Sequence, residues 1–262
     1  MTTMTNDGLL AVADLLGVQT LPLVLGVGPQ QDSAEAWQAA RQQAMAELRG
    51  AGLVTIYDDV ATDLTEALFV LANPERELAA RIYTESGVRQ VCVARKGSRH
   101  AVGTRDGDNF EVGTMWCDGG GAALARPVLE VLGRSAAADI PSISSPIDEL
   151  RERLDEATRS SDYADVFYGR GVAERDAIEF GLAMSSCYGH AEIVAYAYDE
   201  GVTTRTSGAV AIYDTSRGRI AASPGAAPDL RVWSTFTPGT DHRIAQAISA
   251  LIETLPGGRW MP

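Results

Sequence analysis

Apolar residues recur every three or four positions through the first 75 residues, a period typical of amphipathic helices. A glycine or the pair Asn73-Pro74 follows each such stretch, so we predict three helices, over residues 7–16, 32–49 and 63–72. Between the first two, Leu21–Gly26 is apolar but too short for a buried helix, and we expect it to be extended.

The hydrophobic period then changes to two, which is typical of half-buried strands. Alternating stretches separated by short turns cover residues 78–84, 88–95, 100–105 and 109–115. One of the turns is Asp106-Gly107, and an Asp-Gly pair between alternating stretches is a strong hairpin signal. The pattern therefore predicts an antiparallel meander, and the residues after it predict a helix over 122–132.

The same order of elements recurs in the second half of the chain. Helices are expected over residues 146–158, 164–168 and 173–184. Strands are expected over residues 191–199, 203–207, 209–214, 219–223 and 230–236. Thr240 caps a last helix whose apolar face is formed by Ile244, Ile248, Leu251 and Leu255.

We interpret this recurrence as an internal quasi-two-fold repeat within a single domain that spans residues 1–262. The halves are about 1–138 and 139–262, with the boundary in the Pro/Ser-rich stretch 139–146. Two meanders can join edge to edge into one sheet, because each leaves an unpaired edge, and helices then flank that sheet as two bundles. The predicted fold class is α+β, with a central, largely antiparallel sheet. An α+β protein can also show this order by chance, so the repeat stays open here.

The composition of the chain argues against several classes of function. The 262 residues carry a net charge of −13, which argues against nucleic-acid binding, since that needs a surplus of Lys and Arg. The amino terminus lacks a basic cluster, and the longest apolar run, Leu21–Val27, is too short to span a bilayer. Three widely spaced cysteines form neither a disulfide framework nor a zinc motif. We expect a soluble cytoplasmic protein without stable membrane insertion.

The sequence shows no set of residues with the types and spacing of a known catalytic motif. The single lysine, Lys96, excludes a P-loop, and none of the three histidines has a partner at metal-binding spacing. We predict no catalytic residue, no metal and no cofactor. One alternative stays open, a small-molecule-binding or hydrolytic enzyme, which would use the Ser185–His190 cluster and the glycine run Gly119–Gly121. Among the tryptophans, Trp260 is the one that we expect to be most exposed.

Four segments carry a resemblance to a known family. They are ADLLGVQTLPLVLGV, VARKGSRHAVGTRDGD, IYDTSRGRIAASP and FTPGTDHRIAQAISALIETLPGGRW, which begin at Ala13, Val93, Ile212 and Phe236. In this order they resemble the EspG family, the chaperones associated with ESX type VII secretion in mycobacteria and related actinobacteria. The resemblance covers nearly the whole chain and is weakest over residues 155–188.

The resemblance implies a cytoplasmic chaperone that binds PE–PPE heterodimers, mainly through the PPE subunit, keeps them soluble and delivers them to the ESX machinery. It also implies a single sheet flanked by two helical bundles with quasi-two-fold symmetry. No enzymatic activity is implied. Weak self-association through the edges of the sheet is a further alternative.

Two groups of residues are predicted to contact the partner. The first is a cationic hairpin, which can steer an acidic client surface and consists of Arg89, Arg95, Lys96, Ser98 and Arg99. The second group lies in the helical bundle of the second half and consists of Phe167, Tyr168, Phe180 and Met184. The alternatives are a solvated hairpin tip for the first group and core positions for the second.

Overall fold

The structure is a computed structural model that describes residues 1–226 and 232–262, and its centre is one antiparallel β-sheet. The strands are β1 (Thr2–Thr5), β2 (Arg76–Thr84), β3 (Gly87–Lys96), β4 (Arg99–Asp106), β5 (Asn109–Met115), β6 (Ile143–Pro146), β7 (Cys187–Asp199), β8 (Val202–Arg205), β9 (Val210–Thr215), β10 (Gly218–Ala226) and β11 (Val232–Pro238). Ten of them pair in the order β1-β5-β4-β3-β2-β7-β9-β10-β11-β6, and β8 pairs with the end of β7. The predicted α+β class is confirmed.

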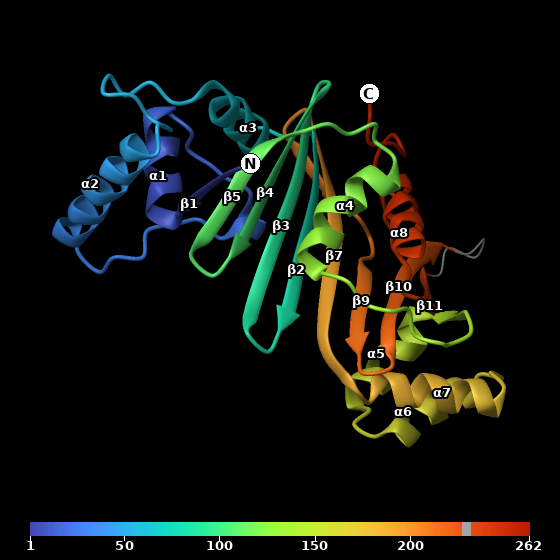
Figure 1. Ribbon diagram of the computed structural model, residues 1–262. Helices are drawn as coiled ribbons and strands as arrows, with labels where there is room; N and C mark the ends of the chain where they lie inside the picture. The colour runs from blue at the N-terminus through green and yellow to red at the C-terminus, as the bar shows by residue number, and fades with distance from the viewer. Residues whose placement is uncertain (227–231) are drawn as a thin grey trace.

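The helices form three groups around this sheet (Figure 1). One bundle contains α1 (Asn6–Leu15), α2 (Ala34–Gly50) and α3 (Thr62–Ala72), and a second contains α5 (Ile147–Glu156), α6 (Ser160–Tyr168) and α7 (Glu174–Met184). The remaining pair is α4 (Gly121–Leu132) and α8 (Asp241–Glu253). A short 3₁₀ helix, η1 (Leu23–Leu25), contacts β2, β3 and β4.

The two faces of the sheet are covered differently. Helices α4 and α8 pack together on the middle of one face, where Leu124 and Ile248 contact the side chains that β2 and β7 direct to that side, such as Leu78 and Ile193. On the opposite face the α1–α3 bundle covers the first half of the sheet and the α5–α7 bundle covers the second half. The helices thus leave the middle of this second face as the least covered part of the sheet.

The predicted junction of two meanders is confirmed, because β2 and β7 pair antiparallel over eight residues, from Arg76↔Ala197 to Tyr83↔His190. Both halves also follow one order: a short edge strand, three helices, a meander and a closing helix. That the halves superpose as a structural repeat stays a prediction, which an internal superposition of residues 1–138 on 139–262 tests.

Apart from shifts of up to four residues at the ends of elements, the structure differs from the predicted elements in three places. Leu21–Gly26 is not extended throughout, because η1 forms there and Gly26 ends it in the left-handed region at φ 59°. Strands β1 and β6, which close the two edges, were not predicted. Of the predicted strand 230–236, Leu230 and Arg231 lie outside the described residues, and β11 begins at Val232.

Candidate partner-binding surface

The middle of the second face forms an open strip between the two helical bundles. Side chains alternate along β2, so Leu78, Ala80 and Ile82 enter the core beneath α4 and α8. Arg81 and Tyr83 therefore point to the opposite face, and the register places them beside Glu192 and His190 of β7. The structure thus brings together four polar or aromatic side chains from segments about 110 residues apart.

Arg81 and Glu192 form the charged part of the strip. They are direct cross-strand neighbours, both side chains are exposed, and neither has an ion-pair partner within the part of the chain that the structure describes. Next to Arg81 lies Gln90 of β3, whose Oε1 is buried and accepts no hydrogen bond in this structure. Arg81 offers several donors and Glu192 offers acceptors, so a polar loop of another protein can satisfy both.

The other part of the strip is aromatic and apolar. The rings of Tyr83 and His190 stack with centroids 4.5 Å apart. Beside them, Val88 is 38% exposed and Tyr188 is 56% exposed, and both belong to the strand ends nearest the β2–β3 turn. Leu23 of η1, at 91% exposure, extends from a segment that contacts β2 and β3. Exposed apolar side chains that lie near one another beside polar residues are typical of protein interaction sites.

The α5–α7 bundle buries most of the contacts predicted there. Phe167 and Phe180 are completely buried and pack edge-to-face on each other at 4.5 Å and on Phe236 of β11 at 5.6 and 5.2 Å. Met184 is 9% exposed in the same core. The prediction that these three residues form a surface is therefore wrong, because they connect the bundle to the sheet. Tyr168, at 57% exposure, is the predicted contact that does lie on the surface.

The predicted cationic hairpin keeps only part of its charge at the surface. Arg95 is buried, with 4% of its side chain exposed, and it pairs with Glu75 at 3.0 Å and donates to the carbonyl of Gly97 at 2.8 Å. Burial lowers the pKa of Arg95, and the carboxylate of Glu75 opposes that shift. The prediction that Arg95 is an exposed cation at the hairpin tip is therefore wrong. Lys96, Ser98 and Arg99 are exposed, and Arg99 lies 3.4 Å from Glu66 of α3.

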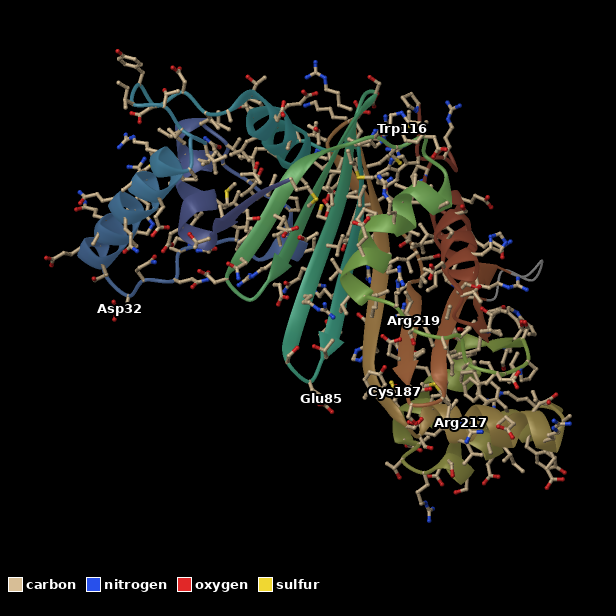
Figure 2. All side chains as sticks on the ribbon, viewed as in Figure 1. Asp32, Glu85, Trp116, Cys187, Arg217 and Arg219 are labelled. Atoms are coloured by element: carbon tan, nitrogen blue, oxygen red, sulfur yellow. The ribbon has the colours of Figure 1, made fainter. Side chains whose placement is uncertain are left out.

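Arg89 does not belong to that hairpin tip. It lies near the start of β3 and Lys96 at its end, so about 23 Å of extended strand separates them. Figure 2 shows the two ends of the sheet: Glu85 of the β2–β3 turn lies at the end where Cys187 and Arg217 meet the α5–α7 bundle, and Trp116 lies at the opposite end. The predicted site therefore separates into two places. Arg89 lies at the end of the sheet next to the bundle that carries Tyr168, and Lys96, Ser98 and Arg99 lie at the opposite end.

The residues proposed for an enzymatic alternative have other roles. The hydroxyls of Ser185 and Ser186 donate to the carbonyls of Leu182 and Ala183 at the end of α7, at 3.3 and 2.8 Å. The Sγ of Cys187 donates to the carbonyl of Gly189, and burial raises the pKa of this thiol. The ring of His190 stacks on the ring of Tyr83, and the hydrogen bonds of Ser185, Ser186 and Cys187 just described do not involve it. These residues do not form a nucleophile and base pair.

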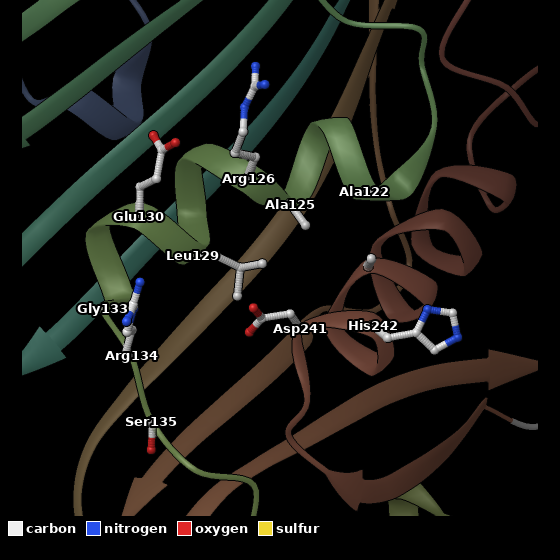
Figure 3. A pocket seen from close by; sticks show the side chains of 11 residues that line it. Ala122, Ala125, Arg126, Leu129, Glu130, Gly133, Arg134, Ser135, Asp241 and His242 are labelled. Carbon is white, nitrogen blue, oxygen red and sulfur yellow. The ribbon is translucent and has the colours of Figure 1, made fainter.

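A trough of about 830 Å³ lies between α4 and α8, on the face opposite the strip (Figure 3). Leu129 and Asp241 face each other across it, and its one hydroxyl side chain, Ser135, donates to the carbonyl of Ala136. The glycine run has a packing role here, because a Cβ on Gly121 would lie 2.2 Å from the carbonyl oxygen of Ala245. The trough thus results from two helices that touch at one end and separate toward the other.

Neither metal binding nor membrane crossing has support in the described part of the chain. Within residues 1–226 and 232–262, His, Cys, Asp and Glu side chains do not gather in groups of three that could hold a metal ion. None of the helices described there combines the length and apolar composition that a bilayer span requires.

A continuous antiparallel sheet with a bundle at each end and an open strip between them defines a scaffold for binding another protein. The chain belongs to the EspG family, whose model matches residues 5–250. It is 28% identical to the ESX-1 secretion-associated protein EspG1 of Mycobacterium tuberculosis, covering 98% of this chain and 88% of that protein. It is 29% identical to the ESX-3 secretion-associated protein EspG3 of Mycolicibacterium smegmatis, covering 99% and 88% of the two chains.

The fold has also been solved in a complex. The type VII secretion system chaperone EspG5 of Mycobacterium tuberculosis, determined with the PE25–PPE41 dimer, matches this structure with a TM-score of 0.82. The match covers 99% of this chain and 98% of that one at 20% sequence identity. Family membership and this chaperone fold point to a non-enzymatic role.

Proposed function

We propose that this protein is a cytoplasmic chaperone that binds PE–PPE heterodimers, keeps them soluble and delivers them to an ESX secretion system, and that it is not an enzyme. The observation that carries the proposal is the match of the EspG family model to residues 5–250. The shared fold with a chaperone solved in complex with a PE–PPE dimer supports it. The hydrogen bonds of Ser185, Ser186 and Cys187 to main-chain carbonyls also favour binding over catalysis.

We further propose that the client binds the open strip and the neighbouring surface of the α5–α7 bundle. The strip combines the charges of Arg81 and Glu192, which have no ion-pair partner among the described residues, with exposed apolar groups at Leu23 and Tyr188. This combination fits a polar loop with apolar anchors. Arg89 and Tyr168 belong to this proposed surface. Lys96, Ser98 and Arg99 lie at the other end of the sheet and would contact a different part of an elongated client.

Co-expression with candidate PE–PPE pairs tests the function. We expect one cognate pair to co-migrate with the chain on size exclusion as a heterotrimer, and to remain insoluble or aggregated without it. Failure of every PE–PPE pair encoded beside the ESX loci of the same organism to co-migrate would contradict the proposal.

A matched pair of charge reversals tests the surface. Arg81→Glu and Arg126→Glu change the net charge equally at exposed arginines, but Arg81 lies on the strip and Arg126 lies on α4, on the opposite face. We expect Arg81→Glu to weaken client binding about tenfold or more, since an interface charge is reversed. Arg126→Glu should bind like the wild type. Equal effects of the two variants would remove the strip as the binding surface.

A further inference from the structure

The connection between α2 and α3 exposes two adjacent large apolar side chains. Ile56 is 78% exposed and Tyr57 is 81% exposed, and among the large apolar residues that the structure describes only Leu23 is more exposed. Single exposed apolar residues are ordinary at a protein surface. Two adjacent exposed apolar residues at the tip of one loop are unusual, because polar residues form such turns equally well and do not expose apolar surface.

The loop holds these side chains outward in one ordered conformation. The hydroxyl oxygen of Thr55 accepts hydrogen bonds from the backbone N–H groups of Tyr57 and Asp59, at 3.2 and 3.1 Å. The N–H of Thr55 donates to the carbonyl of Asp59 at 2.9 Å, and Val54 bridges to Val60. The tip is therefore already ordered before any partner binds, which reduces the entropy lost on binding.

Asp58 joins the loop to helix α2. Its φ of 66° lies in the left-handed region, which aspartate tolerates better than most residues with a Cβ. The carboxylate of Asp58 accepts from Arg49 of α2 at 2.7 Å, which fixes the turn to the helix.

The surroundings of the tip are acidic. Residues 51–66 contain Asp58, Asp59, Asp63 and Glu66 and no Lys or Arg. Arg49 pairs with Asp58 and Arg99 pairs with Glu66, so Asp59 and Asp63 are the acidic residues here without an ion-pair partner in the described part of the chain. A complementary surface would therefore have an apolar pocket for Ile56 and Tyr57 and basic residues around its rim.

The tip is also remote from the proposed client surface. In Figure 1 the loop between α2 and α3 extends from the upper left of the molecule, and the α5–α7 bundle lies at the lower right. The α1–α3 bundle separates the tip from the open strip. A client on the strip would leave Ile56 and Tyr57 accessible.

We propose that Ile56 and Tyr57 form a second docking element, through which a receptor protein with an apolar, basic-rimmed pocket binds the client-loaded chaperone. This inference rests on the proposed function, because the receptor is assigned to the export step that follows client binding. Two surfaces on opposite parts of the fold allow the client and the receptor to be bound at the same time.

The test separates client binding from export. A strain that lacks the gene is complemented with wild-type protein, with the double variant Ile56→Ser and Tyr57→Ser, or with the control Val202→Ser, which removes an exposed apolar side chain on β8. The cognate PE–PPE pair is measured in the cells and in the culture filtrate. The same chains are purified with that pair to obtain affinities and melting temperatures.

We expect the double variant to bind the client and melt like the wild type, while client export falls about tenfold or more, as for loss of two anchor residues. Val202→Ser should export normally. Asp59→Lys should also reduce export, because it opposes a basic rim.

Three results would overturn the docking element. The first is unchanged export by the double variant, and the second is loss of client affinity in that variant, which would mean that the client covers the tip. The third is a wild-type dimer that the variant dissociates, which would mean that a second copy of the chain covers the tip. Absence of client binding by the wild type would overturn the proposed function first, and the receptor with it.

Discussion

Arg219 connects four segments of the chain at a single buried site. Its side chain is 2% exposed, pairs with Asp214 through bonds of 2.6 and 3.0 Å and donates to the carbonyl of Gly133 at the end of α4. Its own backbone carbonyl accepts from the N–H groups of Ala138 and Gly239. A planar, permanently charged fork suits this place, since it binds a carboxylate and a helix C-terminus together.

We therefore expect Arg219→Met to lower the free energy of unfolding by about 3 kcal/mol, because Asp214 and the carbonyl of Gly133 would lose a buried partner. Urea denaturation measures the change. Arg219→Lys keeps the charge but not the fork and should lose about half as much. A loss within 0.5 kcal/mol, the range of ordinary surface changes, would contradict this role of Arg219.

Glu77 makes stability depend on pH. It is 4% exposed near the start of β2, burial raises its pKa, and a 2.8 Å hydrogen bond from the Tyr198 hydroxyl opposes that rise. A pKa that is higher in the folded state means that Glu77 favours folding when protonated and that this contribution is lost as pH rises above 4.5. Glu77→Gln cannot titrate, so its stability relative to the wild type should increase with pH from about 4.5 upward. Denaturation of both proteins at several pH values measures the difference between their free energies of unfolding. A difference that does not change with pH would exclude Glu77 as a source of the pH dependence.

Residue exposure is what the sequence predicts least well here. Arg95 is a charged residue beside a turn, yet it is buried because Glu75 and the Gly97 carbonyl satisfy it. Trp260 was expected to be exposed, yet it is 2% exposed and stacks on His100. In both cases the burial depends on a partner far away in the sequence, Glu75 for Arg95 and His100 for Trp260, which the folded chain brings into contact. The same holds for Arg81 and Glu192, because neither segment of the sequence indicates that β2 and β7 place these residues opposite each other.

At the scale of elements, α4 and α8 approach most closely where α4 begins. Gly121 is buried there, and a Cβ would lie 2.2 Å from both the carbonyl oxygen of Ala245 and the Oγ of Ser249. We expect Gly121→Ala to lower the free energy of unfolding by about 1–3 kcal/mol, as for other overpacked contacts. Gly50→Ala is the control, since a Cβ there would meet open space at the end of α2. Thermal or urea unfolding of both variants measures the change. If Gly121→Ala is as stable as Gly50→Ala, the two helices can move apart at no cost in free energy.

Most elements could be predicted because their hydrophobic period is local. The change from a period near 3.6 to a period of 2 locates the β2–β5 meander, and Asp106-Gly107 marks its last turn. The edge strands β1 and β6 have four residues each, too few for a period, and they form only because β5 and β11 offer unpaired edges. Segment Leu21–Gly26 folds as η1 because the N–H of Leu25 bonds to the carbonyl of Pro22, a local turn that composition does not indicate.

At the scale of the whole molecule, the two halves share one core. Leu124 and Val128 of α4 belong to the first half, Ile244 and Leu251 of α8 belong to the second, and all four lie in one apolar cluster that covers strands of both halves. The β2–β7 ladder runs through the middle of the same sheet. Neither half can bury its part of this cluster or pair its inner edge without the other.

We therefore expect residues 1–138 expressed alone to lack a cooperative unfolding transition, and the same for residues 139–262. A fragment of the first half would expose the β2 edge and the α4 face together, which favours aggregation over folding. Mixing the two fragments after joint refolding should restore a single transition and the far-UV spectrum of the intact chain, because the missing surfaces are complementary. Differential scanning calorimetry of each fragment and of the mixture measures this. A half that melts cooperatively by itself would mean that the sheet joins two independent domains rather than forming one.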